Sequence, residues 1–160
     1  MSYQPQVPSL DRVDYSIIRL LQERGRESFS EIGKSVGLSS QSVGDRVHRL
    51  EQAGIIEGYR AAVSTEKLGF GITAFILVKP NGADARFVRH AAERPEILEC
   101  HRVTGDVSFI NRAAVRDVHH LEDLLEHLEP ISSYVLTLLV LSTAFNRNVS
   151  VGTVEPPSRR

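Results

Sequence analysis

The chain has 160 residues, a length that suits one ordinary domain or two small ones. Its 19 Lys and Arg against 20 Asp and Glu give a formal net charge of −1, which argues against a protein that coats nucleic acid non-specifically but permits one basic face. The single cysteine, Cys100, excludes an internal disulfide and fits a reducing cytoplasm.

We expect neither a secretion signal nor a membrane-spanning segment in this chain. Its first nine residues are polar and contain Pro, and the longest apolar stretch, around residues 134–141, is too short to span a bilayer. We therefore expect a cytoplasmic protein with no membrane partner. The polar and Pro-containing ends predict a flexible arm at residues 1–9 and a flexible tail at 149–160.

Three short helices are predicted in the first third of the chain. In residues 12–23 apolar side chains recur at helical spacing, which predicts the first helix. Asp11 is its predicted N-cap. Ser28 and Glu31 have capping-box spacing ahead of a second helix, whose buried stripe we expect to be Phe29, Ile32 and Val36.

Ser39 is predicted to cap the third helix, residues 40–53, whose apolar stripe is Val43, Val47 and Leu50. Only three residues, 37–39, separate the second and third helices, and Gly37 is among them. This pattern predicts a helix-turn-helix.

After residue 54 the pattern changes to alternating strands and helices. We expect a linker strand at 55–63, which completes a domain of residues 10–63, and a linker at 64–69. Residues 70–148 then follow the order βαββαβ, with strands at 70–79, 97–103, 107–115 and 134–144 and helices at 84–92 and from Asp117 to Pro130. The predicted fold is α+β: a winged helix-turn-helix followed by a ferredoxin-like domain.

The strands of the second domain are apolar on both faces. Ile72, Ala74, Ile76 and Val78 share one side of the first strand, yet Phe75 and Leu77 point to the other. The last strand is apolar on both sides as well. Because helices cover one face only, we expect a second copy of the same sheet to cover the other, giving a homodimer.

The outer face of the third helix is the candidate DNA-binding surface. Gln reads adenine, Arg reads guanine or phosphate, and Ser bonds phosphates or bases. The predicted DNA-contacting residues are Ser39, Ser40, Gln41, Ser42, Asp45, Arg46 and Arg49, with Lys34 and Arg26 on flanking phosphates. A solvated helix face used for protein contacts would carry the same residue types.

A tight turn at residues 103–107 is the candidate effector site. Gly105 suits a positive φ, and the Asp106 carboxylate with nearby N–H groups would suit the ammonium and carboxylate of an amino acid. A plain hairpin turn explains the same residues.

Histidines and the cysteine do not predict a metal site or a nucleophile. His119, His120, Asp123, Glu126 and His127 are explained by the wet face of one helix. Cys100 and His101 are adjacent in a strand and point to opposite faces, so they cannot share a metal, and Cys100 is interpreted as core. We expect no cofactor, no metal and no catalytic residue.

The sequence resembles the Lrp/AsnC family, the feast/famine transcriptional regulators, over about residues 10–145. The matching residues are Leu10-Asp11, Asp14, Ile18, Leu20, Leu21, Gly25-Arg26, Val36-Gly37-Leu38-Ser39, Val43, Arg46-Val47, Arg49-Leu50-Glu51, Gly54-Ile55-Ile56, Gly58-Tyr59, Leu68-Gly69 and Val103-Thr104-Gly105-Asp106.

The resemblance implies a DNA-binding regulator whose second domain, the "regulation of amino-acid metabolism" (RAM) domain, binds a small effector such as an amino acid. It implies a dimer formed through the sheets, often assembled into an octamer. By this resemblance the third helix is the recognition helix, Thr104, Gly105 and Asp106 line the effector site, and Thr137 lies close to the ligand.

This chain departs from the family pattern at three positions. Ser108, which we include in the effector site, stands where a second Asp is common, so the effector differs or is absent. Gly33 stands where Ala is common and Gly44 where larger residues are common. Each glycine within a helix costs roughly 0.5–1 kcal/mol relative to Ala, so both are expected to loosen the first domain.

Two other functions use the same architecture. A siroheme-decarboxylase-like enzyme would recruit His90, His101, Arg102 and Arg112 to hold a tetrapyrrole. A protein-interaction module would keep the helix-turn-helix without binding DNA. The polar outer face of the third helix favours the regulator over the enzyme.

Overall fold

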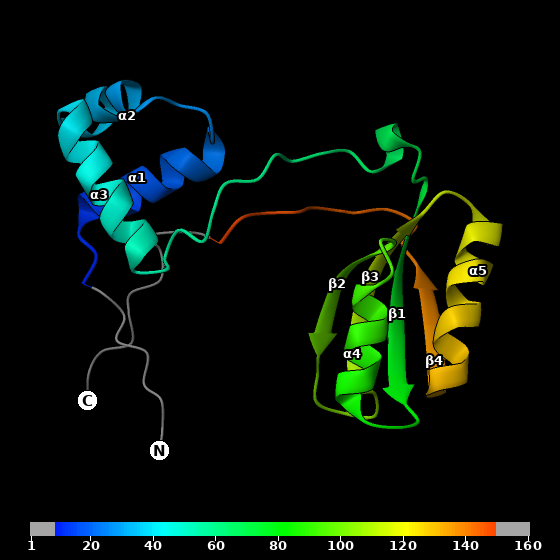
Figure 1. Ribbon diagram of the computed structural model, residues 1–160. Coiled ribbons are helices and arrows are strands. Elements are labelled where there is room, and N and C mark those ends of the chain that lie inside the picture. Colours follow the sequence, from blue (N-terminus) through cyan, green and yellow to red (C-terminus); the bar gives the residue numbers. More distant parts are fainter. Residues whose placement is uncertain (1–8, 150–160) are drawn as a thin grey trace, which may run out of the picture. The chain divides into compact units, whose positions relative to one another are not determined.

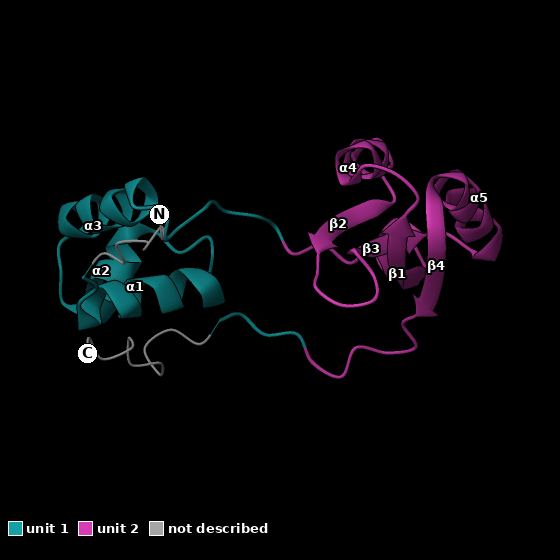
Figure 2. Ribbon diagram, turned by 90° about the horizontal axis from the view of Figure 1, so that it is seen from below, with its two compact units in different colours: residues 1–61, 146–160 teal, residues 62–145 magenta. Residues whose placement is uncertain are grey.

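The computed structural model describes residues 9–149, so the flexible arm and tail predicted at the two ends lie almost entirely outside the described residues. The chain divides into two compact units, residues 1–61 with 146–160 and residues 62–145 (Figure 2). Within residues 9–149, no helix is long and apolar enough to cross a membrane.

The first unit is built from three helices, α1 (Arg12–Glu23), α2 (Phe29–Val36) and α3 (Ser40–Gln52), shown in Figure 1. The three predicted N-caps, Asp11, Ser28 and Ser39, each accept a hydrogen bond from the backbone N–H three residues on. The helices enclose a small apolar core made of Ile17, Leu20, Ile32, Val43 and Val47.

The turn between α2 and α3 explains one of the unusual glycines. A Cβ on Gly33 would lie 2.5 Å from the carbonyl oxygen of Leu38, which is closer than real side chains come. Gly33 is therefore required by this turn, and the expectation that it merely loosens the domain is wrong. A Cβ on Gly44 would meet only the Phe29 ring, at 3.4 Å, an ordinary contact.

Two predictions for the first unit are wrong. Phe29 is 41% exposed instead of buried, because it stands at the first position of α2 over Gly44. The linker strand expected at 55–63, and with it the wing, does not form, since these residues pair with no other strand in the described part of the chain. An extended segment needs a partner strand to satisfy its backbone in a sheet.

The second unit is a four-stranded antiparallel sheet with the strand order β2-β3-β1-β4. Its strands are β1 (Ile72–Pro80), β2 (Ile97–Arg102), β3 (Phe109–Val115) and β4 (Ser132–Leu139), and its helices are α4 (Asp84–Ala92) and α5 (Val118–Leu128). Short 3-10 helices, η1 (Glu66–Leu68) and η2 (Glu129–Ile131), precede β1 and β4. The βαββαβ order is the ferredoxin-like arrangement predicted.

Both helices of this unit lie on the same side of the sheet, as Figure 2 shows. Their inward residues enclose one core with β1 and β3, in which the Phe87 and Phe109 rings lie 4.9 Å apart between centroids. Strand β4 ends at Leu139, five residues earlier than predicted, and β3 begins at Phe109, two residues later.

The opposite face of the sheet is uncovered in the single chain. Phe75 of β1 is 38% exposed, and Tyr134, Leu136 and Leu138 of β4 are exposed as well. The register places Phe75 opposite Leu138 on one side and opposite Arg112 on the other. The bare face is thus apolar toward β4 and carries charge toward β2.

Candidate nucleic-acid interface and effector turn

Helix α3 exposes two different polar stripes beside its buried one. Val43, Val47 and Leu50 face the core. Opposite them, at helical spacing, lies a stripe that we name the outer stripe: Gln41, Asp45, His48 and Gln52, all exposed. A second stripe lies on the flank of the helix and comprises Ser42, Arg46 and Arg49.

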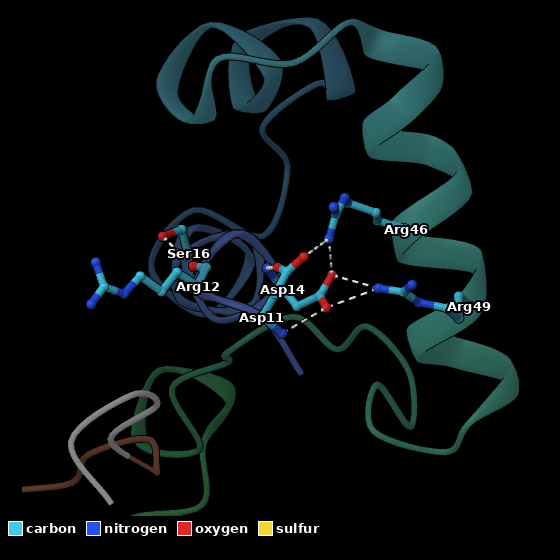
Figure 3. A network of polar contacts seen from close by, with 6 residues as sticks. All are labelled: Asp11, Arg12, Asp14, Ser16, Arg46 and Arg49. Atoms are coloured by element: carbon cyan, nitrogen blue, oxygen red, sulfur yellow. Dashed lines mark hydrogen bonds and ion pairs between the residues drawn. The ribbon is translucent and has the colours of Figure 1, made fainter. Parts of the chain in front are cut away.

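The flank of α3 is held against the start of α1 by an ion-pair network (Figure 3). The Arg46 Nη1 donates to Asp11 Oδ2 at 2.7 Å and to Asp14 Oδ1 at 2.8 Å. The Arg49 Nη2 donates to both oxygens of Asp14, at 2.9 and 2.8 Å. Both arginines predicted to contact DNA therefore have intramolecular partners, which the sequence interpretation missed.

Asp14 is fully buried, whereas Asp11 is exposed. The N–H of Asp11 also donates to Asp14 Oδ2 at 3.1 Å, completing the capping box of α1. The backbone N–H of Asp14 and, next, the Arg46 guanidinium hold the pKa of Asp11 below its usual value.

A signal for this network was present in the sequence. Asp14 stands three and four residues before Ile17 and Ile18, on the apolar stripe of α1. A carboxylate on a buried stripe requires a cation, because an unpaired buried charge is strongly unfavourable. The positions of Arg46 and Arg49, more than 30 residues away, could not be paired with it from spacing alone.

The other predicted DNA-binding residues of this region are differently placed. Ser40 and Gln41 are exposed at the first turn of α3, and Lys34 and Arg26 are exposed outside it. The Ser42 hydroxyl lies 2.9 Å from that of Ser39, whose oxygen caps the helix. The side chains of these two serines therefore stabilise the turn that leads into α3.

The far end of α3 makes contacts that the sequence did not suggest. The Tyr59 hydroxyl donates to Glu51 Oε1 at 2.9 Å, and the His48 and Gln52 side chains lie 2.9 Å apart. Burial and the adjacent Glu51 carboxylate raise the pKa of Tyr59. This bond ties the segment after α3 back onto the helix.

The predicted effector turn is an exposed connection between β2 and β3. The N–H of Val103 donates to the Ser108 carbonyl at 2.9 Å, and the N–H of Ser108 donates to the Val78 carbonyl at 3.0 Å. Between them Thr104, Gly105 and Asp106 are exposed, and Gly105 adopts φ 122°, which only glycine takes without strain. Within residues 9–149, no hydrogen bond or ion pair holds the Asp106 carboxylate.

Thr137 is not joined to this turn within one chain. It lies opposite Ile76 in the register of β1 and β4, on the helix-covered side of the sheet, and is half-buried. None of the hydrogen bonds in the described chain connects it to residues 104–106.

The residues recruited for the enzyme hypothesis do not converge. His90 bonds the His127 carbonyl, Arg102 pairs with Asp84 at 2.8 Å, and His101 and Arg112 share Glu99. The Arg112 guanidinium and then His101 lower the pKa of Glu99.

Two single-residue interpretations in this unit are wrong. Cys100 is exposed and not in the core, and it lies on β2, an edge strand of the sheet. His120 is buried rather than on the wet face, with its Nε2 2.9 Å from Glu96 Oε1. The described residues contain no group of three side chains placed to hold a metal ion.

A helix-turn-helix followed by a ferredoxin-like domain is the architecture expected of an Lrp/AsnC-type transcriptional regulator. The AsnC-type helix-turn-helix domain matches residues 10–51, and the Lrp/AsnC ligand binding domain matches residues 73–149. The chain belongs to the Lrp/AsnC family and is a helix-turn-helix transcriptional regulator. The family, the α+β fold and the regulatory function predicted from the sequence are confirmed.

Similar proteins span almost the same length. An uncharacterized HTH-type transcriptional regulator of Bacillus subtilis, YezC, is 39% identical over 84% of this chain and 96% of its own. The structure of B. subtilis LrpC has a TM-score of 0.83 and 28% identity, covering 87% of this chain and 99% of that chain. A Neisseria meningitidis transcriptional regulator in complex with L-Met has a TM-score of 0.79 and 30% identity, covering 89% and 96%.

Proposed function

We propose that this regulator reads double-stranded DNA with the outer stripe and first turn of α3, and that an amino acid bound beside residues 104–106 modulates the binding. The observation that carries the first half is the exposed outer stripe directly opposite the buried stripe of α3. At 13 residues, α3 is about 20 Å long and can lie in a major groove about 12 Å wide.

The predicted DNA-binding residues take three roles in this proposal. Gln41 and Asp45 face base edges, where amide and carboxylate groups discriminate between bases. Ser39 and Ser42 shape the turn, and Ser40 sits among the free N–H groups at the start of α3, which suit a phosphate. The cationic members contact phosphates: Arg46, Arg49, Lys34 and Arg26.

DNA reading by α3 is tested on a duplex selected from a random pool by the wild-type chain. Gln41→Ala is expected to weaken binding to that duplex by about 1–3 kcal/mol and to relax its sequence preference. The control is Gln22→Ala, which removes the same side chain from an exposed position on α1. Equal gel-shift affinity of the two variants would refute the role of α3.

The effector proposal rests on the exposed turn and on the chemistry it offers. The Asp106 carboxylate is free to accept an ammonium group, and the similar N. meningitidis regulator was solved with L-Met. Ser108 keeps a hydroxyl where a carboxylate is common in the family, so we expect one charged contact to the ligand and not two.

A thermal-shift screen of the proteinogenic amino acids identifies the effector, because a ligand that binds only the folded state raises the melting temperature. Asp106→Ala is expected to weaken that ligand by about 1.5–3 kcal/mol, the contribution of a hydrogen bond to a charged group, while DNA affinity without ligand stays unchanged. Asp123→Ala, an exposed Asp on α5, is the control. Calorimetry that finds the same affinity for both variants would place the effector elsewhere.

We also propose a homodimer in the cytoplasm with no enzymatic activity. The bare face of the sheet supports the dimer, because exposed Phe75, Leu136 and Leu138 would cover one another across two copies. A stable interface needs about 800 Å² from each copy. Similarity to transcriptional regulators supports the absence of catalysis. An absorbance spectrum of the purified chain with a tetrapyrrole band would overturn it.

A further inference from the structure

We propose that Asp14 is a positioning residue, which holds Arg46 and Arg49 so that the free edges of their guanidinium groups contact the DNA backbone. In this arrangement both arginines bind phosphates, and only the outer stripe of α3 reads the sequence. The inference rests on the proposed function, in that it takes α3 as the DNA-contacting helix.

The Asp14 carboxylate is saturated and buried. Its Oδ1 accepts from both arginines, and its Oδ2 accepts from Arg49 and from the N–H of Asp11. The side chain is only 1% exposed. Because the carboxylate is buried, water cannot replace these donors, and losing them would leave its charge unsatisfied. The two arginines are therefore held in a fixed geometry.

Each arginine uses only one terminal nitrogen in the network. Arg46 donates through Nη1 and Arg49 through Nη2, so the other terminal nitrogen and Nε of each stay outside these bonds. The Arg49 side chain is 59% exposed. A guanidinium offers five N–H donors in a planar fork that matches a phosphate, so a carboxylate on one side leaves a second side for DNA.

Charge alone does not give these arginines a role in DNA binding. Two carboxylates, Asp11 and Asp14, balance the two guanidinium groups, which lowers their long-range attraction for DNA. What the network supplies instead is orientation, because an arginine already ordered by Asp14 loses less side-chain freedom when it binds a phosphate.

The placement of the arginines separates them from the bases. They lie on the flank of α3 that faces α1 (Figure 3). The helical repeat of 3.6 residues sets them about a quarter turn from the line of Gln41, Asp45 and His48. When the outer stripe points to the floor of a groove, a flank points to its wall, which is the phosphate backbone. The arginines are therefore expected to strengthen binding to all sequences alike.

The test uses Asp14→Asn, which keeps the shape of the side chain and removes its charge. We expect affinity for the selected duplex and for a scrambled duplex to fall together, by about tenfold, with their ratio unchanged. The slope of log affinity against log salt should become shallower by about 1–2, because fewer counterions are released. A purely structural role for Asp14 would not change this slope.

Asp11→Asn is the matched control, since Asp11 bonds only Arg46 of the two arginines. It should produce a smaller change in the same direction. In a background of Arg46→Ala and Arg49→Ala, Asp14→Asn should add no further loss of binding, because the residue acts through those two side chains.

Three outcomes would overturn the proposal: unchanged or tighter binding by Asp14→Asn, a collapse of the ratio between the two duplexes, or a further loss in the double-arginine background. If circular dichroism shows that Asp14→Asn does not fold, Arg49→Lys tests the proposal in its place. A lysine has no planar fork of donors, so it cannot bind Asp14 and a phosphate at the same time. It should weaken both duplexes about equally, and unchanged binding would overturn the proposal.

The result also separates this proposal from the proposed function. If Gln41→Ala relaxes the sequence preference while Asp14→Asn binds like the wild type, only the positioning role fails. If neither variant differs from the wild type, the role of α3 in DNA binding fails as well.

Discussion

Two helical glycines of the helix-turn-helix, Gly33 and Gly44, differ in the space available for a side chain. A Cβ on Gly33 would meet the Leu38 carbonyl oxygen at 2.5 Å, whereas on Gly44 it would touch only the Phe29 ring. Gly33→Ala should therefore lower the free energy of unfolding by about 1–3 kcal/mol through overpacking. Gly44→Ala should raise it by about 0.5–1 kcal/mol through helix propensity.

Urea unfolding of the two variants checks this pair of predictions, with each glycine as the control for the other. The account is contradicted if both variants are more stable than the wild type, because helix propensity alone would then explain both. It is also contradicted if both are less stable, because position 44 would then lack room for a methyl group.

Glu96 links folding to pH within the second unit. Burial raises the pKa of Glu96, but its hydrogen bond to His120, its own backbone and the charges of His120 and Arg94 outweigh that effect, so the pKa lies below the usual 4.5. A carboxylate with a lowered folded pKa stabilises the protein above its unfolded pKa, and this stability is lost as the pH falls through the folded value.

Glu96→Gln should consequently lose less unfolding free energy than the wild type between about pH 5 and pH 3. Chemical unfolding at a series of pH values measures the two slopes. Glu122→Gln, whose side chain is 65% exposed, serves as the control and should follow the wild type. A wild-type slope for Glu96→Gln would show that the His120 pair does not contribute to acid stability.

At the scale of elements, helix α2 depends most on its cap because it has only eight residues. Ser28 accepts from the N–H of Glu31 at 3.3 Å, and Glu31 accepts from the N–H of Ser28 at 2.9 Å. Ser28→Ala should therefore lower the free energy of unfolding by about 1 kcal/mol.

Ser35→Ala is the comparison for this prediction. Ser35 belongs to the same helix and bonds only the Glu31 carbonyl, at 3.2 Å. Its loss should be nearly neutral. If the two variants have the same melting temperature, the Ser28 cap does not stabilise α2.

Elements whose determinants are local were predictable, and those that depend on distant partners were not. The caps Asp11, Ser28 and Ser39 and the bounds of α1 follow from residues within one turn. The pairing of Asp14 with Arg46 and Arg49 joins two helices across the fold, so only the buried position of Asp14 was visible in the sequence. The linker strand failed for the same reason, since its partner cannot be read from its own residues.

At the scale of the whole molecule, the bare sheet face is the proposed dimer interface. A dimer would supply the two α3 helices that are proposed to read DNA. If Leu138 lies at the centre of a dimer interface, Leu138→Asp should convert the dimer to a monomer, because a buried unpaired charge is strongly unfavourable. Sedimentation velocity measures the change, and Val118→Asp, at an exposed apolar residue of α5, is the control. A dimer that survives Leu138→Asp would place the interface elsewhere.

The central claim is that a pair of α3 helices reads DNA, and footprinting on the selected duplex tests it most directly. We predict two symmetric protected half-sites on one face of the DNA, about 10.5 base pairs or a multiple apart, and their loss in Gln41→Ala. A single unsymmetrical protected region, or protection that persists unchanged in Gln41→Ala, would contradict the account.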